Sequence, residues 1–81
     1  MNDDTREALH AFFDTHAYEV RSSRAAIWHE RVVSAVCRHF MRERPDLAQP
    51  DSNDVADVLD ALGYRVTVDN GKFAWRRLRL T

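Results

Sequence analysis

Two extended runs flanking an Asn-Gly pair near the carboxyl end constrain the fold of this chain most. In "YRVTVDNGKFAWRRLRL" (64–80), Tyr64, Val66 and Val68 alternate with polar residues ahead of "DNG" at 69–71. Asn-Gly between such runs is a strong signal for a tight β-hairpin, because both residues accept a positive φ. The sequence therefore predicts a carboxyl-terminal hairpin over about 64–80.

The second run of this hairpin contains two different apolar faces. Leu78 and Leu80 share one face, and Phe73 and Trp75 share the other. If the leucines face the core, strand alternation points the aromatic residues away from it. A bulge would reset this alternation and allow the aromatic residues to be buried as well.

The amino-terminal segment predicts a helix followed by a short strand. Apolar residues at helical spacing indicate a helix over about 4–15. Asp4 and Glu7 stand three residues apart, as in a capping box with aspartate at the cap. Beyond the helix, Tyr18 and Val20 alternate with charged residues, which is compatible with a short strand near 17–20.

A second helix is predicted over about 24–44. Ser22 or Ser23 is its expected N-cap, and Pro45 follows its end. One broad face of this helix is apolar. By helical geometry, four arginines lie within about 40° of one another on the other side. This arginine ridge consists of Arg24, Arg31, Arg38 and Arg42.

A third helix is predicted over about 52–62, with Asp51 or Ser52 at its start and Gly63 as its C′ residue. Its apolar stripe lies opposite an acidic ridge of Asp54, Asp57 and Asp60. The order is helix, short strand, helix, helix and hairpin. We therefore expect an α+β fold of the winged helix-turn-helix type, with three helices and a C-terminal β-hairpin wing.

Length and composition set the broad class of the protein. The chain has 81 residues, which predicts one domain over 1–81, and its 44% hydrophobic and 31% charged residues argue against disorder. No apolar run approaches the roughly 20 residues that span a bilayer, so no membrane partner is expected. The single Cys37 has no intramolecular disulfide partner, which fits a cytoplasmic location.

The net charge of −1 conceals four blocks of alternating sign. Residues 1–16 and 45–63 are acidic, and the second of these blocks has five aspartates and no base. Residues 17–44 carry six arginines against three glutamates, and residues 64–81 carry five basic residues against one aspartate. Such segregation is informative about binding partners, although it says nothing about the fold.

Residues from about 9 to 80 resemble the C-terminal winged-helix domain of phage and plasmid primase-helicases, a family related to the poxvirus helicase-primase. The resemblance is carried by Phe12, Phe13 and Asp14, by "IWHERVVSAVCRHF" and "SNDVADVLDALGY", and by Gly71, Trp75, Leu78, Arg79 and Leu80. Arg77 replaces a residue that is usually small in the family. The resemblance implies a DNA-associated replication accessory module of a phage or other mobile element, acting in the host cytoplasm. The primase and ATPase domains of the family are absent from this chain.

The predicted wing is the first candidate for contact with DNA. Its basic residues are suited to phosphates or to a minor groove; they are Arg65, Lys72, Arg76, Arg77 and Arg79. Phe73 and Trp75, if exposed, are candidates for stacking on unpaired bases. The arginine ridge of the second helix is a further candidate for the phosphate backbone. Together these residues predict a non-enzymatic DNA-binding protein with weak sequence specificity.

The third helix argues against the usual docking of a winged helix in the major groove. Duplex DNA carries one negative charge per roughly 1.7 Å of axis, so the exposed acidic ridge of Asp54, Asp57 and Asp60 is repelled by it. The alternative function is a protein-interaction module or small phage inhibitor that uses this ridge as its contact surface. Basic and acidic faces on one domain also permit self-association.

The sequence shows no pattern that indicates catalysis, a metal or a cofactor. His10, His16, His29 and His39 are scattered, and neither HExxH nor CxxC occurs. Nothing resembles a P-loop. We therefore expect no enzymatic activity, no metal and no cofactor.

Overall fold

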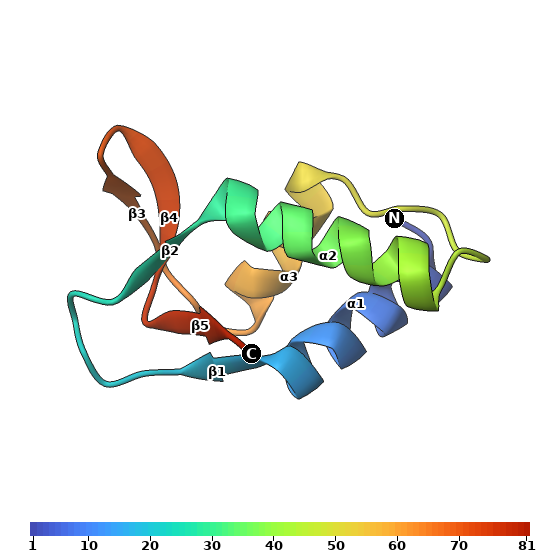
Figure 1. Cartoon of the computed structure of the whole chain (residues 1–81), viewed down its shortest axis with the longest axis horizontal. Helices are drawn as coiled ribbons and strands as arrows, with labels where there is room; N and C mark the ends of the chain where they lie inside the picture. The colour runs from blue at the N-terminus through green and yellow to red at the C-terminus, as the bar shows by residue number, and fades with distance from the viewer.

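The chain begins with helix α1 (Asp3–His16), in a computed structural model that describes all residues, 1–81 (Figure 1). Its cap is Asn2, whose side-chain oxygen accepts a 2.8 Å hydrogen bond from the backbone N–H of Thr5. The expected capping box of Asp4 and Glu7 is therefore wrong, because the helix begins earlier and its cap is Asn2, two residues before Asp4. Thr5 is buried, and its hydroxyl donates to the carbonyl of Ala48 at 2.9 Å.

Five short strands form two antiparallel sheets, so the α+β class is confirmed. One sheet pairs β1 (Ala17–Glu19) with β5 (Leu78–Leu80), and the other contains β2 (Ala26–Trp28), β3 (Val66–Asp69) and β4 (Lys72–Arg76) in the order β2-β4-β3. Between β3 and β4, Asn70 and Gly71 have φ values of 53° and 76°, as a tight hairpin turn requires. The predicted turn is confirmed. The predicted hairpin over 64–80 is corrected, because its return strand is divided between the two sheets.

Arg77 is the residue that divides the return strand. It has a φ of 58°, its N–H donates to the carbonyl of Ala25 at 2.8 Å, and its carbonyl accepts from Val20 at 2.9 Å. Residues 20–25 thus form a loop between β1 and β2, and both ends of this loop are hydrogen-bonded to Arg77. The break resets the alternation of side chains, so Trp75 and Leu78 are both buried.

Helix α2 (His29–Glu43) begins five residues later than predicted. Residues 26–28 pair with β4 instead, because their backbone groups find partners there: Ala26 lies opposite Arg76, and Trp28 opposite Ala74. Trp28 occupies the N-cap position without a capping side-chain hydrogen bond. The expected cap at Ser22 or Ser23 is therefore wrong, and Arg24 lies in a loop rather than on the helix.

Helix α3 (Ser52–Ala61) is bounded by local signals at both ends. Asp51 caps it, and Asp54 accepts a reciprocal 3.0 Å hydrogen bond from the Asp51 backbone N–H, which completes a capping box. At its end, Gly63 has a φ of 94°, and its N–H donates to the carbonyl of Asp60 at 3.0 Å. The N–H of Tyr64 donates to Leu59 at 3.1 Å, which is the second bond of a Schellman motif.

Replacing Gly63 with alanine is expected to lower the free energy of unfolding by about 1–2 kcal/mol. The reason is conformational, because a left-handed φ places Cβ too close to the following carbonyl, whereas no other atom lies within 4 Å of the added Cβ. Thermal denaturation followed by circular dichroism measures the change. Ala61→Gly is the matched control within the helix, and it is expected to destabilise by up to about 1 kcal/mol through helix propensity. An unchanged melting temperature for Gly63→Ala would contradict the left-handed conformation.

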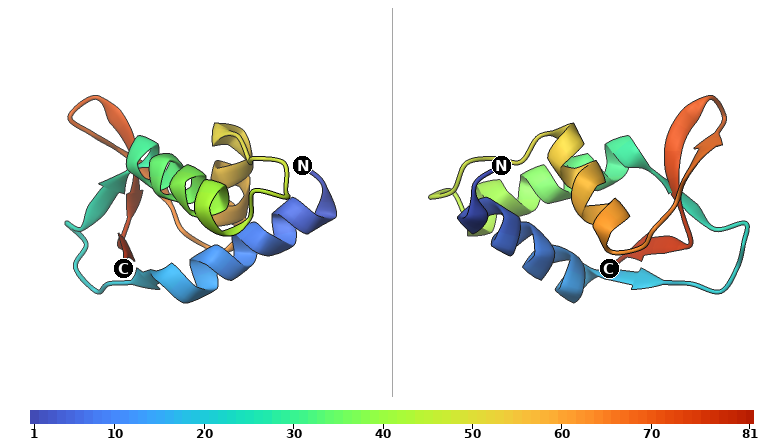
Figure 2. Two further views of the ribbon diagram at one scale, coloured as in Figure 1. Left: turned by 45° about the vertical axis from the view of Figure 1, so that its right-hand side comes forward. Right: turned by 180° about the vertical axis from the view of Figure 1, so that it is seen from behind.

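The core lies where the three helices meet the inner faces of the strands (Figures 1 and 2). It consists of Ala8, Leu9, Phe12, Phe13, Val32, Val36, Phe40, Val55, Val58, Leu59, Trp75 and Leu78. The amphipathic stripes that the sequence predicts for the helices supply ten of these residues. None of the helices combines the length and apolar content needed to span a bilayer.

Candidate nucleic-acid interface

Three arginines converge at the junction between the two sheets. Arg65 precedes β3, Arg76 ends β4, and Arg77 is the left-handed residue between β4 and β5. All three line one surface hollow of about 310 Å³, which we name the arginine groove. Its remaining lining residues are Glu19, Ser23, Gly63 and Tyr64. The groove therefore joins segments that lie at least 40 positions apart in the chain.

Arg65 and Arg76 lie directly opposite each other on neighbouring strands. The backbone N–H of Arg76 donates to the carbonyl of Arg65 at 2.9 Å, and this pairing continues the β3–β4 register. Residues directly opposite on antiparallel strands project to the same face, and like charges there are destabilising. No carboxylate lies within 4.0 Å of either guanidinium or of Arg77. The groove thus holds positive charge that the chain does not neutralise by an ion pair.

The loop of residues 20–25 forms the other wall of the arginine groove through Ser23. Arg21 and Arg24 flank the Ser22–Ser23 pair, and both are exposed and free of ion pairs. Arg24 was expected near phosphates as part of a helical ridge, and the structure instead places it in the loop, next in sequence to Ser23. Sequence reasoning did not select Arg21. Its signal was the excess of arginine in residues 17–44, but only the closure of the loop on Arg77 reveals its location.

Tyr64 and Glu19 are the other polar side chains that shape the groove. Burial raises the pKa of the Tyr64 hydroxyl above its usual value near 10, and the charge of Glu19 raises this pKa further. The hydroxyl therefore keeps its proton at neutral pH, where it remains able to donate a hydrogen bond. Glu19 is the one acidic residue that lines the groove, so the lining carries three positive charges against one negative charge.

Lys72 is occupied by contacts within the protein. Its ammonium lies 2.8 Å from a carboxylate oxygen of Glu30 and 4.4 Å from the ring centroid of Trp28. The Trp28 indole N–H in turn donates to Asp69 at 3.0 Å. An ion pair and a cation–π contact both compete with an external phosphate for this lysine. The structure thus separates Lys72 from the unneutralised arginines.

Arg79 also has an internal role. It is half-buried, and its guanidinium donates to the carbonyls of Ala26 at 3.0 Å and Leu78 at 3.3 Å. The bond to Ala26 joins β5 to β2 across the boundary between the two sheets, whereas the bond to Leu78 stays within β5. Of the five basic residues predicted in the wing, the structure brings only Arg65, Arg76 and Arg77 together in the groove.

The two aromatic residues proposed for base stacking have different environments. Trp75 is 4% exposed within the core, so its role as a stacking platform is corrected to packing. Its indole N–H donates to Nδ1 of His29 at 2.9 Å, and Nε2 of His29 lies 2.9 Å from the hydroxyl of Ser52. Phe73 is 69% exposed and lies opposite Val68. This pair is three residues along the strands from the Arg65–Arg76 pair, which is an odd number. Strand alternation therefore places Phe73 on the other face of the hairpin.

The two charged helical ridges differ from their predicted extent. Arg31, Arg38 and Arg42 remain exposed on α2, and Arg42 lies 3.4 Å from Glu43. On α3, the side chain of Asp54 is used in the capping box, whereas Asp57 and Asp60 are exposed and have no ion pair. The acidic ridge therefore has two free members.

His16 and His39 are distant in sequence but adjacent in the structure, and they are not part of a metal-binding group. The rings of His16 and His39 lie 5.6 Å apart between centroids, and Phe12 contacts both. No group of three or more His, Cys, Asp or Glu side chains is arranged to hold a metal ion. The contacts around these two rings are those of aromatic packing at the surface of the core.

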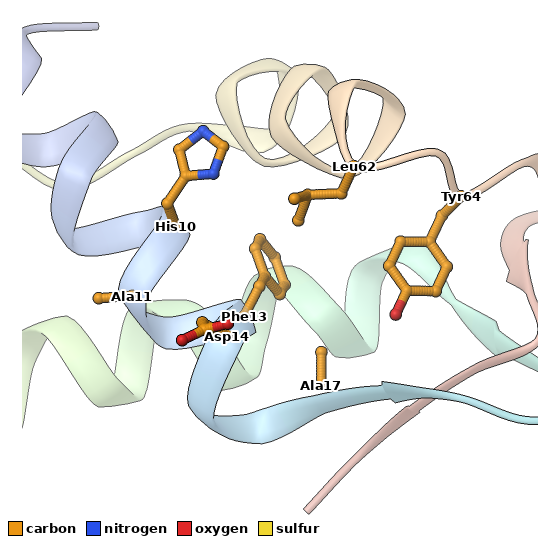
Figure 3. A pocket seen from close by; sticks show the side chains of 7 residues that line it. All are labelled: His10, Ala11, Phe13, Asp14, Ala17, Leu62 and Tyr64. Carbon is orange, nitrogen blue, oxygen red and sulfur yellow. The ribbon is translucent and has the colours of Figure 1, made fainter.

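A second hollow, of about 460 Å³, lies between α1 and the end of α3 (Figure 3). Most of its lining is apolar, with Phe13 and Leu62 facing each other across it and Tyr64 at one side. His10 and Asp14 supply its other polar groups. Every buried polar side-chain atom of the protein has a hydrogen-bond partner, so no buried unpaired group is available to orient a ligand in this hollow.

The arginine groove has the chemistry of an anion site. A guanidinium offers five donors in a planar fork that matches phosphate oxygens, and it remains charged at any physiological pH. Two or three such forks at one surface bind a phosphate through charge-assisted hydrogen bonds. The groove lacks a nucleophile paired with a base, which acyl or phosphoryl transfer would require. No protein-family model, no curated protein and no solved structure matches this chain.

Proposed function

We propose that the protein is a non-enzymatic nucleic-acid-binding protein that holds the phosphate backbone in the arginine groove. The observation that supports this function most directly is the cross-strand pair of Arg65 and Arg76 beside Arg77, with no carboxylate within 4.0 Å of any of the three. A surface that served only solubility would have a more even mixture of both signs than three arginines against one glutamate. A bound phosphate would offset the repulsion between the arginines, so it would also stabilise the hairpin locally.

We further propose that the fold is a variant of the winged helix. The order of α1, β2, α2, α3 and the β3–β4 hairpin supports this assignment. The hairpin is then the wing, and its base rather than its tip carries the unneutralised charge. The resemblance to the winged-helix domain of phage and plasmid primase-helicases suggests a replication accessory protein of a mobile element.

Backbone contact at the base of the wing also suits the charges of α3. Asp57 and Asp60 are exposed on this helix, and the helix has no basic residue. Placing this face in a major groove brings carboxylates against phosphates, which is unfavourable. Binding through the arginine groove avoids that contact. Because such contacts go to phosphates rather than to base edges, weak sequence specificity is the expected consequence.

Titration of a fluorescein-labelled duplex with the intact protein is expected to show binding that weakens steeply with salt. Three phosphate contacts predict that log K falls against log salt with a slope of about −2.7. Fluorescence anisotropy at several salt concentrations between about 50 and 200 mM measures this slope. Two duplexes of unrelated sequence should bind with affinities within about threefold of each other.

The matched control for this titration is Lys72→Ala, which removes a positive charge near the hairpin turn that is already paired with Glu30. Its salt slope is expected to equal that of the intact protein, since no phosphate contact is lost. Absence of binding by the intact protein at the lowest salt would refute the proposed function.

A further inference from the structure

Strand β3 has a free edge that the fold leaves uncovered. The strand order β2-β4-β3 makes it the outer strand of its sheet, and the hairpin projects away from the helices (Figures 1 and 2). Val66 and Val68 are 55% and 65% exposed, and Phe73 beside them on β4 is 69% exposed. Natural edge strands are usually protected by proline, by a bulge or by charged side chains, and Val66, Thr67 and Val68 supply none of these.

The hydrogen-bond phase of β3 identifies which of its backbone groups face outward. Arg65 bonds to Arg76 on β4, and Asp69 lies opposite Lys72 across the two-residue turn. Bonded pairs recur at every second residue of an antiparallel ladder, so Arg65, Thr67 and Asp69 direct their N–H and C=O groups toward β4. Val66 and Val68 therefore present theirs to the open edge.

We propose that β3 pairs antiparallel with β3 of a second copy of this chain, about a two-fold axis that passes beside Thr67. In this register Val66 lies opposite Val68 of the second copy, and the converse pair is identical. All four outward N–H and C=O groups of each strand segment find partners, and one six-stranded sheet results. A shift of one residue would set outward groups against residues that are already bonded to β4, so the phase excludes it.

The charges that flank the strand select the same register. Arg65 comes to lie opposite Asp69 of the second copy, and the two-fold axis repeats this pair. These are non-hydrogen-bonded positions, where opposite side chains are closest and unlike charges are favourable. Asp69 uses one carboxylate oxygen for the Trp28 indole, which leaves the other available. Shifting the register by two residues in either direction loses both charge pairs, and parallel pairing would bring like charges together.

The apolar side chains of the hairpin fall on one face of this sheet. Val66, Val68 and Phe73 share the face opposite Arg65 and Arg76, since Val68 lies opposite Phe73. In the dimer the two sets become adjacent across the two-fold axis, and cross-strand valine pairs cover part of each exposed patch. The free edge, the flanking charges and the exposed apolar face thus all favour a second copy of this chain as the partner of β3.

Disulfide formation by single cysteine variants tests the register. In a Cys37→Ala background the introduced cysteine is the only thiol. Thr67→Cys places two thiols directly opposite across the axis, at a Cα separation of about 4.5 Å that a disulfide accepts. Val66→Cys and Val68→Cys are matched controls, because each lies two positions from its own copy in the second chain. We expect Thr67→Cys to cross-link at least about tenfold faster than either control. Equal rates, or a faster control, would overturn the proposed pairing.

Sedimentation velocity tests the association itself, without nucleic acid and therefore independently of the proposed function. The unmodified protein should dimerise with increasing concentration, in the weak range of interfaces that bury less than about 1,200 Å². Arg65→Asp and Asp69→Arg each create two like-charge pairs, and each should raise the dissociation constant about tenfold or more. The double variant Arg65→Asp with Asp69→Arg should restore dimerisation. A monomer at about 1 mM, or a double variant weaker than both single variants, would overturn the proposal.

Discussion

Replacing Trp75 with alanine is expected to lower the free energy of unfolding by about 3–5 kcal/mol. The indole is 4% exposed and belongs to the core formed with the helices, so its removal leaves a cavity as well as lost apolar contact. It also removes the 2.9 Å hydrogen bond to His29, the residue that links β4 to the start of α3 through Ser52. For a chain of this size such a loss is a large fraction of the total stability. Urea denaturation followed by circular dichroism measures it.

Phe73→Ala is the matched control for this substitution, because it removes another aromatic ring from the same strand. Phe73 is 69% exposed, so the expected change in stability is within about 0.5 kcal/mol. Similar losses for the two variants would contradict the burial of Trp75 and the reset of side-chain alternation at Arg77. The contrast therefore tests the break between β4 and β5 directly.

Replacing Arg76 with alanine and Arg77 with glycine together is expected to weaken duplex binding about 10- to 100-fold. Two of the three groove arginines are lost, and the salt slope should become less steep by about 1.8, since each lost phosphate contact contributes about 0.9. Glycine is chosen at Arg77 because the φ of 58° suits it, so the fold should be kept or slightly stabilised. Anisotropy titrations at several salt concentrations give both quantities.

The control for this variant is Arg42→Ala with Arg44→Ala, which changes the net charge by the same amount. Both of these arginines are exposed and already paired, with Glu43 at 3.4 Å and with Asp46 at 3.2 Å. Their loss should alter duplex affinity by less than about threefold. If the control weakens binding as much as the groove variant does, net charge rather than the arginine groove governs affinity. That result would contradict the proposed interface.

Local sequence signals correctly predicted the tight turn of the hairpin and both ends of α3. Asn70 and Gly71 form the expected tight turn, Asp51 caps α3, and Gly63 ends it in the left-handed conformation. Each of these outcomes depends on the φ preference or side-chain hydrogen bonds of residues within a few positions. The apolar stripes of the helices are likewise a periodic property of each segment, and they form the core as expected.

The start of α2 was predicted wrongly because pairing with a distant strand competed with helix formation. Residues 24–28 fit a helical pattern, but Ala26, Ile27 and Trp28 pair with β4, about 48 positions away in sequence. Because of the same long-range pairing, Arg24 lies in the loop before β2 and not on the helical ridge. Sequence periodicity over one segment contains no information about such a competitor.

The sequence predicted that arginines of the hairpin form the candidate site, but it did not predict which of the basic residues belong to it. Arg65, Arg76 and Arg77 were selected from the basic second run of the hairpin, and the structure brings them together. Lys72 and Arg79 were selected on the same ground, yet an ion pair and two backbone carbonyls occupy them. Arg21 was missed altogether. Which cations are free depends on partners that lie far away in sequence.

The sequence by itself determined the tight turn at Asn70–Gly71, both ends of α3 and the apolar faces of the helices, because each depends on the conformational preference of a few neighbouring residues. Tertiary structure alone decided where the return strand breaks, which aromatic residue is buried and which arginines remain unneutralised. The physical reason is that Arg77 takes its left-handed conformation between two hydrogen bonds to residues 20 and 25, more than 50 positions away. The conformation of Arg77 thus decides which side chains of β4 and β5 face the core.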